Sequence, residues 1–190
     1  MRTTICYLVS LSFLLSACEQ TSQQSDAEGV NPLISAAETG DLTLLDQLIE
    51  KNSLIDVRDQ CEWTPLMKAA LNGHLKSVQS LLLAGAEPNL TEKGGYSPLM
   101  LAASNNHSNI VRILLEYGAN VNQIENTNGW TALIWAAKQG HQKTIKTLLQ
   151  HRANTNHRDY SGKTAKDWAL EGKYNRVIDL IDQSDRENTS

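Results

Sequence analysis

Several kinds of feature are scarce or missing in this chain of 190 residues. There is one phenylalanine, so a hydrophobic core must be built from leucine, isoleucine, valine and alanine. Basic residues form no run, and the formal net charge is −4, which argues against nucleic acid as a partner. The apolar run at residues 5–15 has eleven residues, about 16 Å as a helix, whereas a bilayer core is about 30 Å thick. This run is therefore too short to span a membrane.

The apolar run instead has the length of the central part of a signal peptide. It follows a short basic start and ends in LSAC at residues 15–18. This ending resembles the bacterial lipobox, which marks processing by the lipoprotein signal peptidase. The resemblance implies cleavage before Cys18, with covalent lipid on its sulfur and its new amine. The alternative is an ordinary signal peptide in which Cys18 is incidental.

Residues 19–30 are polar and predict a disordered tether with a mean reach of about 20 Å. Several acyl chains on Cys18 would anchor it stably, because each buried CH₂ contributes about 0.8 kcal/mol. Glu19 follows the cysteine, where an aspartate favours inner-membrane retention in enterobacteria. We therefore expect a lipid-anchored protein of the bacterial cell envelope, at the outer membrane and facing the periplasm.

One motif recurs along the rest of the chain at spacings of 33, 33, 34 and 33 residues. A fixed period of this size indicates an array of stacked supersecondary units. Each copy opens with Asn, Thr or Ser, which suit a helix N-cap, and proline follows in three copies. A glycine or asparagine suited to a left-handed cap ends the first helix in four of them. The copies are NPLISAAETGD from Asn31, TPLMKAALNGH from Thr64, SPLMLAASNNH from Ser97, TALIWAAKQGH from Thr131 and TAKDWALEGKY from Thr164.

A second helix follows the first in each unit, because apolar residues recur at helical spacing, as at Val78, Leu81 and Leu82. Polar links with turn residues, such as those at 93–95 and 128–129, then lead to the next cap. Each unit is therefore predicted as helix, turn, helix and extended loop.

These units resemble the ankyrin repeat family, on the evidence of TPLMKAALNGH (64–74), LLLAGAEPN (81–89) and LLEYGANVNQ (114–123). The resemblance implies an all-α solenoid of five ankyrin repeats, with paired antiparallel helices, β-hairpin loops and a concave protein-binding face. It covers residues 31–183. The expected organisation is a lipoprotein signal peptide (1–17), the acylated cysteine and tether (18–30), repeats at 31–63, 64–96, 97–130, 131–163 and 164–183, and a polar tail (184–190).

The chain departs from the family pattern at identifiable places. The usual histidine of the first helix is replaced in every unit, in two of them by Met67 and Met100, which can fill the space by packing. The loop before Thr131 holds one extra residue, hence the spacing of 34. Asp182 occupies an otherwise apolar position, which gives the fifth unit the polar outer face that a terminal repeat requires.

Three histidines at one repeat position, His74, His107 and His141, could suggest a metal or catalytic cluster. Successive units stack about 8–10 Å apart, whereas zinc needs its ligands about 2 Å from one ion. We therefore assign these histidines a structural role at the turn between the helices. Phosphate-loop, zinc and nucleophile-elbow motifs are missing, so neither enzyme activity nor a metal or other cofactor is expected.

Cys61 is the only cysteine besides Cys18 that follows the signal peptide, because Cys6 lies within it. An acylated Cys18 could not pair with it. Two interpretations stay open: a tolerated residue near a loop tip, or a thiol that bridges to a partner or senses oxidants.

Aromatic residues recur directly before the capping position, and Trp135 and Trp168 lie one turn into the first helix, which lines the concave face in the family. Tryptophan and tyrosine are frequent in binding hot spots, but rings before the cap could instead only pack loop against loop. Both interpretations stay open. The predicted partner-binding residues of the concave face are Trp63, Asn72, Lys93, Tyr96, Asn105, Trp130, Trp135, Lys138 and Tyr160.

The leading hypothesis is a monomeric, membrane-anchored interaction module of the cell envelope that binds a protein partner on its concave face. It would act as an inhibitor or immunity protein, or as a scaffold for an envelope enzyme. One alternative is a structural envelope protein that contacts peptidoglycan or lipid, with aromatic rings stacked on sugars. Another is a redox sensor that uses Cys61.

Overall fold

The computed structural model describes residues 31–51 and 54–188, within the compact unit Asn31–Ser190. The predicted signal peptide, Cys18 and the tether lie outside the described residues. The described residues form ten helices and no strand, and none of these helices is long and apolar enough to cross a membrane. The helices are α2 (Pro32–Thr39), α3 (Leu42–Lys51), α4 (Pro65–Asn72), α5 (Leu75–Leu83), α6 (Pro98–Ser104), α7 (Ser108–Glu116), α8 (Ala132–Lys138), α9 (Gln142–Gln150), α10 (Ala165–Glu171) and α11 (Asn175–Asn188).

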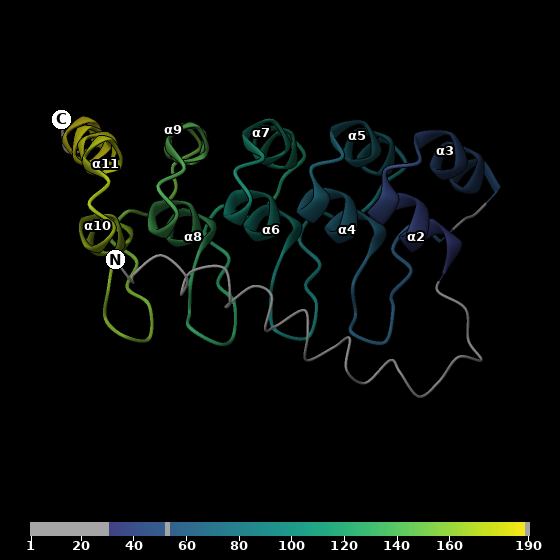
Figure 1. The fold of residues 1–190 in the computed structure, drawn as a ribbon, viewed down its shortest axis with the longest axis horizontal. Helices are drawn as coiled ribbons and strands as arrows, with labels where there is room; N and C mark the ends of the chain where they lie inside the picture. The colour runs from purple at the N-terminus through teal and green to yellow at the C-terminus, as the bar shows by residue number, and fades with distance from the viewer. Residues whose placement is uncertain (1–30, 52–53, 189–190) are drawn as a thin grey trace, which may run out of the picture. The chain divides into compact units, whose positions relative to one another are not determined.

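The helices lie in two rows (Figure 1). In the inner row α2, α4, α6, α8 and α10 each contact the next, and in the outer row α3, α5, α7, α9 and α11 do the same. Each inner helix also packs on the outer helix that follows it. The loops that lead from an outer helix to the next inner helix project beyond the inner row on one side. We call the inner helices and these loops the loop–helix face. The predicted all-α solenoid of helix pairs is thereby confirmed.

The predicted caps set the ends of the inner helices. The Thr64 hydroxyl accepts a hydrogen bond from the Met67 backbone N–H (3.3 Å), and Asn31 accepts one from Leu33 (2.9 Å). Gly73 ends α4 with φ +80° in the left-handed region, where a side chain would add strain. The predicted capping residues are therefore confirmed, and Ser97, Thr131 and Thr164 repeat the Thr64 bond.

Small residues let the inner helices approach one another closely. Ala69 and Ala70 on α4 are fully buried, and so are Met67 and, almost completely, Met100. The two methionines fill the space of the family's usual histidine by packing, as predicted.

The connecting loops are simpler than the expected β-hairpins, because the described residues contain no strand. Within each loop one backbone hydrogen bond closes a turn, from the N–H of the acidic residue that begins the turn to the carbonyl of the residue that ends it. The third loop spans one residue more than the others, which confirms the predicted insertion. The closing bonds are Asp59 to Trp63, Glu92 to Tyr96, Glu125 to Trp130 and Asp159 to Lys163.

The fifth unit extends further than predicted. Helix α11 runs to Asn188, through most of the segment predicted as a polar tail. Residues 184–187 contain no glycine or proline to stop it, and Asp185 accepts a hydrogen bond from the Thr155 hydroxyl (2.6 Å). Asp182, predicted to give this terminal unit a polar outer face, forms an ion pair with Lys166 of α10 at 2.5 Å.

Candidate partner-binding face

The repeated histidines join each unit to the one before it. His107 Nε2 donates to the Leu71 carbonyl oxygen at 3.1 Å. A Cβ on Gly73 would lie 2.6 Å from the His107 ring, so this glycine also provides the space that the ring occupies. The predicted structural role at the turn is confirmed. His74 and His141 make the same contact with the carbonyls of Glu38 (3.0 Å) and Ser104 (3.1 Å). No group of three or more His, Cys, Asp or Glu in residues 31–51 and 54–188 could hold a metal ion.

An acidic side chain stabilises each loop, a feature that the sequence analysis missed. Asp59 accepts the backbone N–H groups of Cys61 (2.8 Å) and Trp63 (2.9 Å), and Glu92 accepts that of Tyr96 (2.9 Å). This role could have been predicted from the sequence, because one acidic residue recurs in each loop with the same spacing as the helices. The acidic residues of the third and fourth loops are Glu125, which is fully buried, and Asp159.

Neighbouring loops are also joined to each other through the backbone. The Asn126 N–H donates to the Gly94 carbonyl and the Tyr160 N–H to the Asn128 carbonyl, both at 2.9 Å. The Lys93 N–H donates to the Cys61 carbonyl at 3.3 Å. The loops are therefore ordered as a row and do not project independently.

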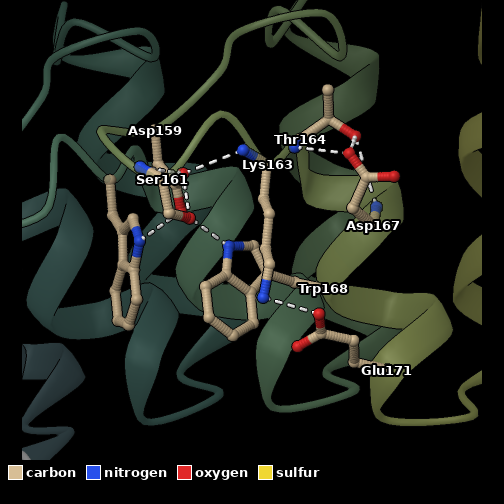
Figure 2. A network of polar contacts seen from close by, with 8 residues as sticks. Asp159, Ser161, Lys163, Thr164, Asp167, Trp168 and Glu171 are labelled. Atoms are coloured by element: carbon tan, nitrogen blue, oxygen red, sulfur yellow. Dashed lines mark hydrogen bonds and ion pairs between the residues drawn. The ribbon is translucent and has the colours of Figure 1, made fainter.

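Asp159 of the fourth unit connects the third unit with the fifth (Figure 2). Its Oδ2 atom accepts the indole N–H groups of Trp130 and Trp168, both at 2.8 Å. Its Oδ1 atom accepts hydrogen bonds from Ser161 and from the Lys163 backbone. Burial opposes ionisation here, but these hydrogen bonds outweigh it, led by Ser161, and hold the pKa of Asp159 well below its usual range. The carboxylate therefore stays charged and fixes two tryptophans.

The predicted aromatic residues form one cluster. Trp135 meets Trp130 edge to face, with ring centroids 4.6 Å apart, and Tyr96 at 5.9 Å. Trp130 meets Trp168 at 5.4 Å. The exposed fractions of Tyr96, Trp130 and Trp135 are 5%, 7% and 2%. These three predicted binding residues therefore pack the loop bases onto the inner helices, because burying large rings stabilises the array. They offer a partner almost no surface.

The other predicted binding residues lie at the surface or are half-buried. Asn72 and Asn105 are exposed, and each side-chain amide donates to the carbonyl four residues earlier, at 3.1 and 2.9 Å. Gln139 holds the same repeat position and is exposed as well. Lys93 and Tyr160 are exposed on the loops, and Trp63 is half-buried beneath the Lys68 ammonium group, 5.0 Å from its ring.

Two lysines flank the tryptophans at the C-terminal end of this face. Lys138 Nζ lies 3.7 Å from the ring centroid of Trp168 and 4.7 Å from that of Trp130. Lys163 Nζ lies 4.2 Å from Trp168 and 2.6 Å from a Glu171 oxygen (Figure 2). Burial lowers the pKa of Lys138; Glu171 raises it and Lys163 lowers it further. Lys163 and Trp168 were not among the predicted site residues.

Cys61 is half-buried on the first loop, where its backbone N–H donates to Asp59 (2.8 Å) and its carbonyl accepts from the Lys93 N–H (3.3 Å). The sugar-stacking alternative loses support, because Tyr96, Trp130 and Trp135 are buried.

A family model described as ankyrin repeats (3 copies) matches the chain in four overlapping stretches, at residues 7–92, 33–125, 76–159 and 99–188. These stretches together contain every described helix. No curated protein matches the chain.

Proposed function

Because the chain belongs to the ankyrin repeat family, we propose that it is a lipid-anchored module of the bacterial cell envelope that binds a protein partner on its loop–helix face. Ankyrin repeats are protein–protein interaction modules and are generally not enzymes. The observation that carries the choice of face is a row of exposed polar side chains, one in each of the first four units. It consists of Thr39, Asn72, Asn105 and Gln139.

This row suits recognition because the scaffold fixes the spacing of its members. The first three side chains each donate a hydrogen bond to the carbonyl four residues earlier in their helix. An asparagine held in this way presents its amide in a defined direction, and less conformational entropy is lost on binding. The carboxylates and backbone bonds of the loops hold the neighbouring surface in place as well.

The proposed anchor rests on the LSAC sequence at residues 15–18 and the polar segment after it. A lipid on Cys18 would confine the repeat array to the membrane surface, close to envelope or secreted proteins. In that place the module would act as an inhibitor or immunity protein, or as a scaffold for an envelope enzyme.

A comparison of two variants tests the proposed binding face. The chain from residue 19 onwards, bearing an affinity tag, is used to capture proteins from envelope extract. Asn72→Arg/Asn105→Arg should lose the captured protein, because bulky cations would block the row. Gln79→Arg/Asn109→Arg, on exposed outer-helix positions, should retain it. Capture that is unaffected by the first pair but abolished by the second would refute the assignment.

The anchor is tested separately. Cys18→Ala should leave an unprocessed precursor without lipid, because the acylated sulfur is gone. Metabolic labelling with a fatty acid, followed by gel analysis, measures this. Normal labelling of the variant would refute the lipobox interpretation.

A further inference from the structure

Charge is distributed unevenly along the array, although the formal net charge is only −4. Residues 31–63 hold seven acidic and two basic residues, whereas residues 131–163 hold six basic residues and one acidic residue. That single acid is Asp159, which is buried and hydrogen-bonded. The surface of the fourth unit therefore carries positive charge without negative charge. Its bases are Lys138, Lys143, Lys146, Arg152, Arg158 and Lys163.

The acidic residues of the adjoining loop and helix α10 do not cancel this charge. Asp159 accepts five hydrogen bonds from neighbouring groups. Asp167 forms a capping box with Thr164, and hydrogen bonds to that residue lower the pKa of Asp167. Glu171 pairs with Lys163, and both side chains are more than a third exposed. Exposed pairs of this kind contribute at most about 1 kcal/mol, so another carboxylate can compete for the lysine.

Lys138 and Lys163 lie on the loop–helix face and are held in position. Both ammonium groups contact the Trp168 ring, and Lys138 contacts that of Trp130 too. Burial disfavours the ammonium form of Lys138 and lowers its pKa, an effect that Glu171 opposes and Lys163 reinforces. A carboxylate that arrives beside the two lysines would therefore be stabilised more than at a fully hydrated lysine.

We propose that the loop–helix face at α8 and α10 receives an acidic segment of the protein partner, with its carboxylates against Lys138 and Lys163. This inference rests on the proposed function, since it assumes a protein partner on that face. The acidic N-terminal unit would repel the same segment, so the charge distribution fixes which end of the array it binds. The half-buried Trp168 ring, which both lysines contact, would add contact with the aliphatic parts of the segment.

A poly-glutamate peptide provides the probe, and poly-lysine of the same length is the control. The chain from residue 19 onwards contains the whole compact unit Asn31–Ser190 and is used for titration. Poly-glutamate should change the tryptophan fluorescence at low salt and lose affinity as salt is added, because screening weakens exposed charge pairs. Poly-lysine should bind more weakly than poly-glutamate.

A matched pair of double variants separates the site from net charge. Lys138→Gln/Lys163→Gln should weaken poly-glutamate binding about tenfold, equivalent to ~1.4 kcal/mol. Lys143→Gln/Lys146→Gln removes the same charge from α9 in the outer row and should change affinity less than about twofold. Lys138→Arg keeps the charge and should retain binding, which controls for loss of the fold.

Three outcomes would overturn the inference: no binding of poly-glutamate at low salt, equal weakening by both double variants, or binding to phosphatidylglycerol vesicles without binding to the peptide. The proposed function is judged separately by capture from envelope extract. If Lys138→Gln/Lys163→Gln still captures the partner with unchanged affinity while Asn72→Arg/Asn105→Arg does not, the binding face stands and the acidic-segment inference fails.

Discussion

At the scale of single residues, Asp159 joins the C-terminal units through five hydrogen bonds. Its carboxylate holds the indoles of Trp130 and Trp168, which come from the units on either side of its own, and the backbone of its own loop. The side chain is 5% exposed, so an unmatched hydrogen-bond donor left there would have little access to water.

Asp159→Asn should lower the free energy of unfolding by about 2–3 kcal/mol, because an amide offers fewer acceptors and places an NH₂ group against donors. The folded-state pKa of Asp159 is depressed, so its contribution is present above the unfolded value of about 3.9 and is lost as the pH falls below it. As the pH falls below about 4, the free energy of unfolding should therefore decrease less in the variant than in the parent. Urea unfolding at several pH values measures both effects. Asp179→Asn, at an exposed position of α11, is the control, and an equal loss there would contradict the argument.

The roles of some of these residues could be predicted from the sequence, whereas the roles of others depend on contacts that the sequence does not reveal. The capping threonines were predictable because their role depends on spacing within one unit, and the turn histidines because they recur at one repeat position. The choice between buried and exposed rings for Trp130 and Trp135 was not, since it depends on contacts between units. The role of Asp159 was not predicted, because its indole partners lie 29 and 9 residues away in the sequence.

At the scale of elements, the turn between the helices of a unit combines backbone shape with packing. Gly73 has φ +80°, and its missing side chain leaves room for the His107 ring of the next unit. Gly85, after the outer helix α5, has φ +93° but nothing within 4 Å of the position where a Cβ would lie. The two glycines therefore differ in packing while they share a left-handed backbone.

Gly85→Ala should lower the free energy of unfolding by about 1–2 kcal/mol, the cost of a side chain in the left-handed region. Gly73→Ala should cost more, because its Cβ would also meet the His107 ring at 2.6 Å. Thermal or urea unfolding measures the difference. In the His107→Ala background that difference should shrink, which a double-mutant cycle detects. Equal costs for both glycines in the parent chain would contradict the packing argument.

Most of the elements were predictable, because each inner helix begins at a capping residue and each outer helix carries apolar residues at helical spacing. The loops were predicted less well, because one cross-loop hydrogen bond and an acidic side chain take the place of a strand ladder. The C-terminal end of α11 was missed as well, since the contact of Asp185 with Thr155 joins residues 30 positions apart.

At the scale of the whole array, each inner helix packs on its immediate neighbours in the row. Stability in such an array is close to a sum of unit and interface contributions. Helices α4, α6 and α8 have a neighbour on both sides, whereas α2 and α10 have one neighbour each in the described part of the row. Amides of α4, α6 and α8 should therefore be the most protected in native-state hydrogen exchange. Uniform protection along the row would contradict this expectation.

The uneven charge also belongs to this scale, because no single unit reveals it. An acidic first unit and a basic fourth unit make the two ends of the array differ in charge, which the small net charge conceals. A partner with a complementary charge distribution would bind in one orientation only.

The most direct test of the central claim, partner binding through the loop–helix face, is site-specific photo-crosslinking in living cells. A photoreactive residue is placed at Asn105 on this face or at Lys143 on the exposed outer row. We expect a discrete crosslinked product from position 105 and none from position 143. A product from position 143 alone would contradict the account.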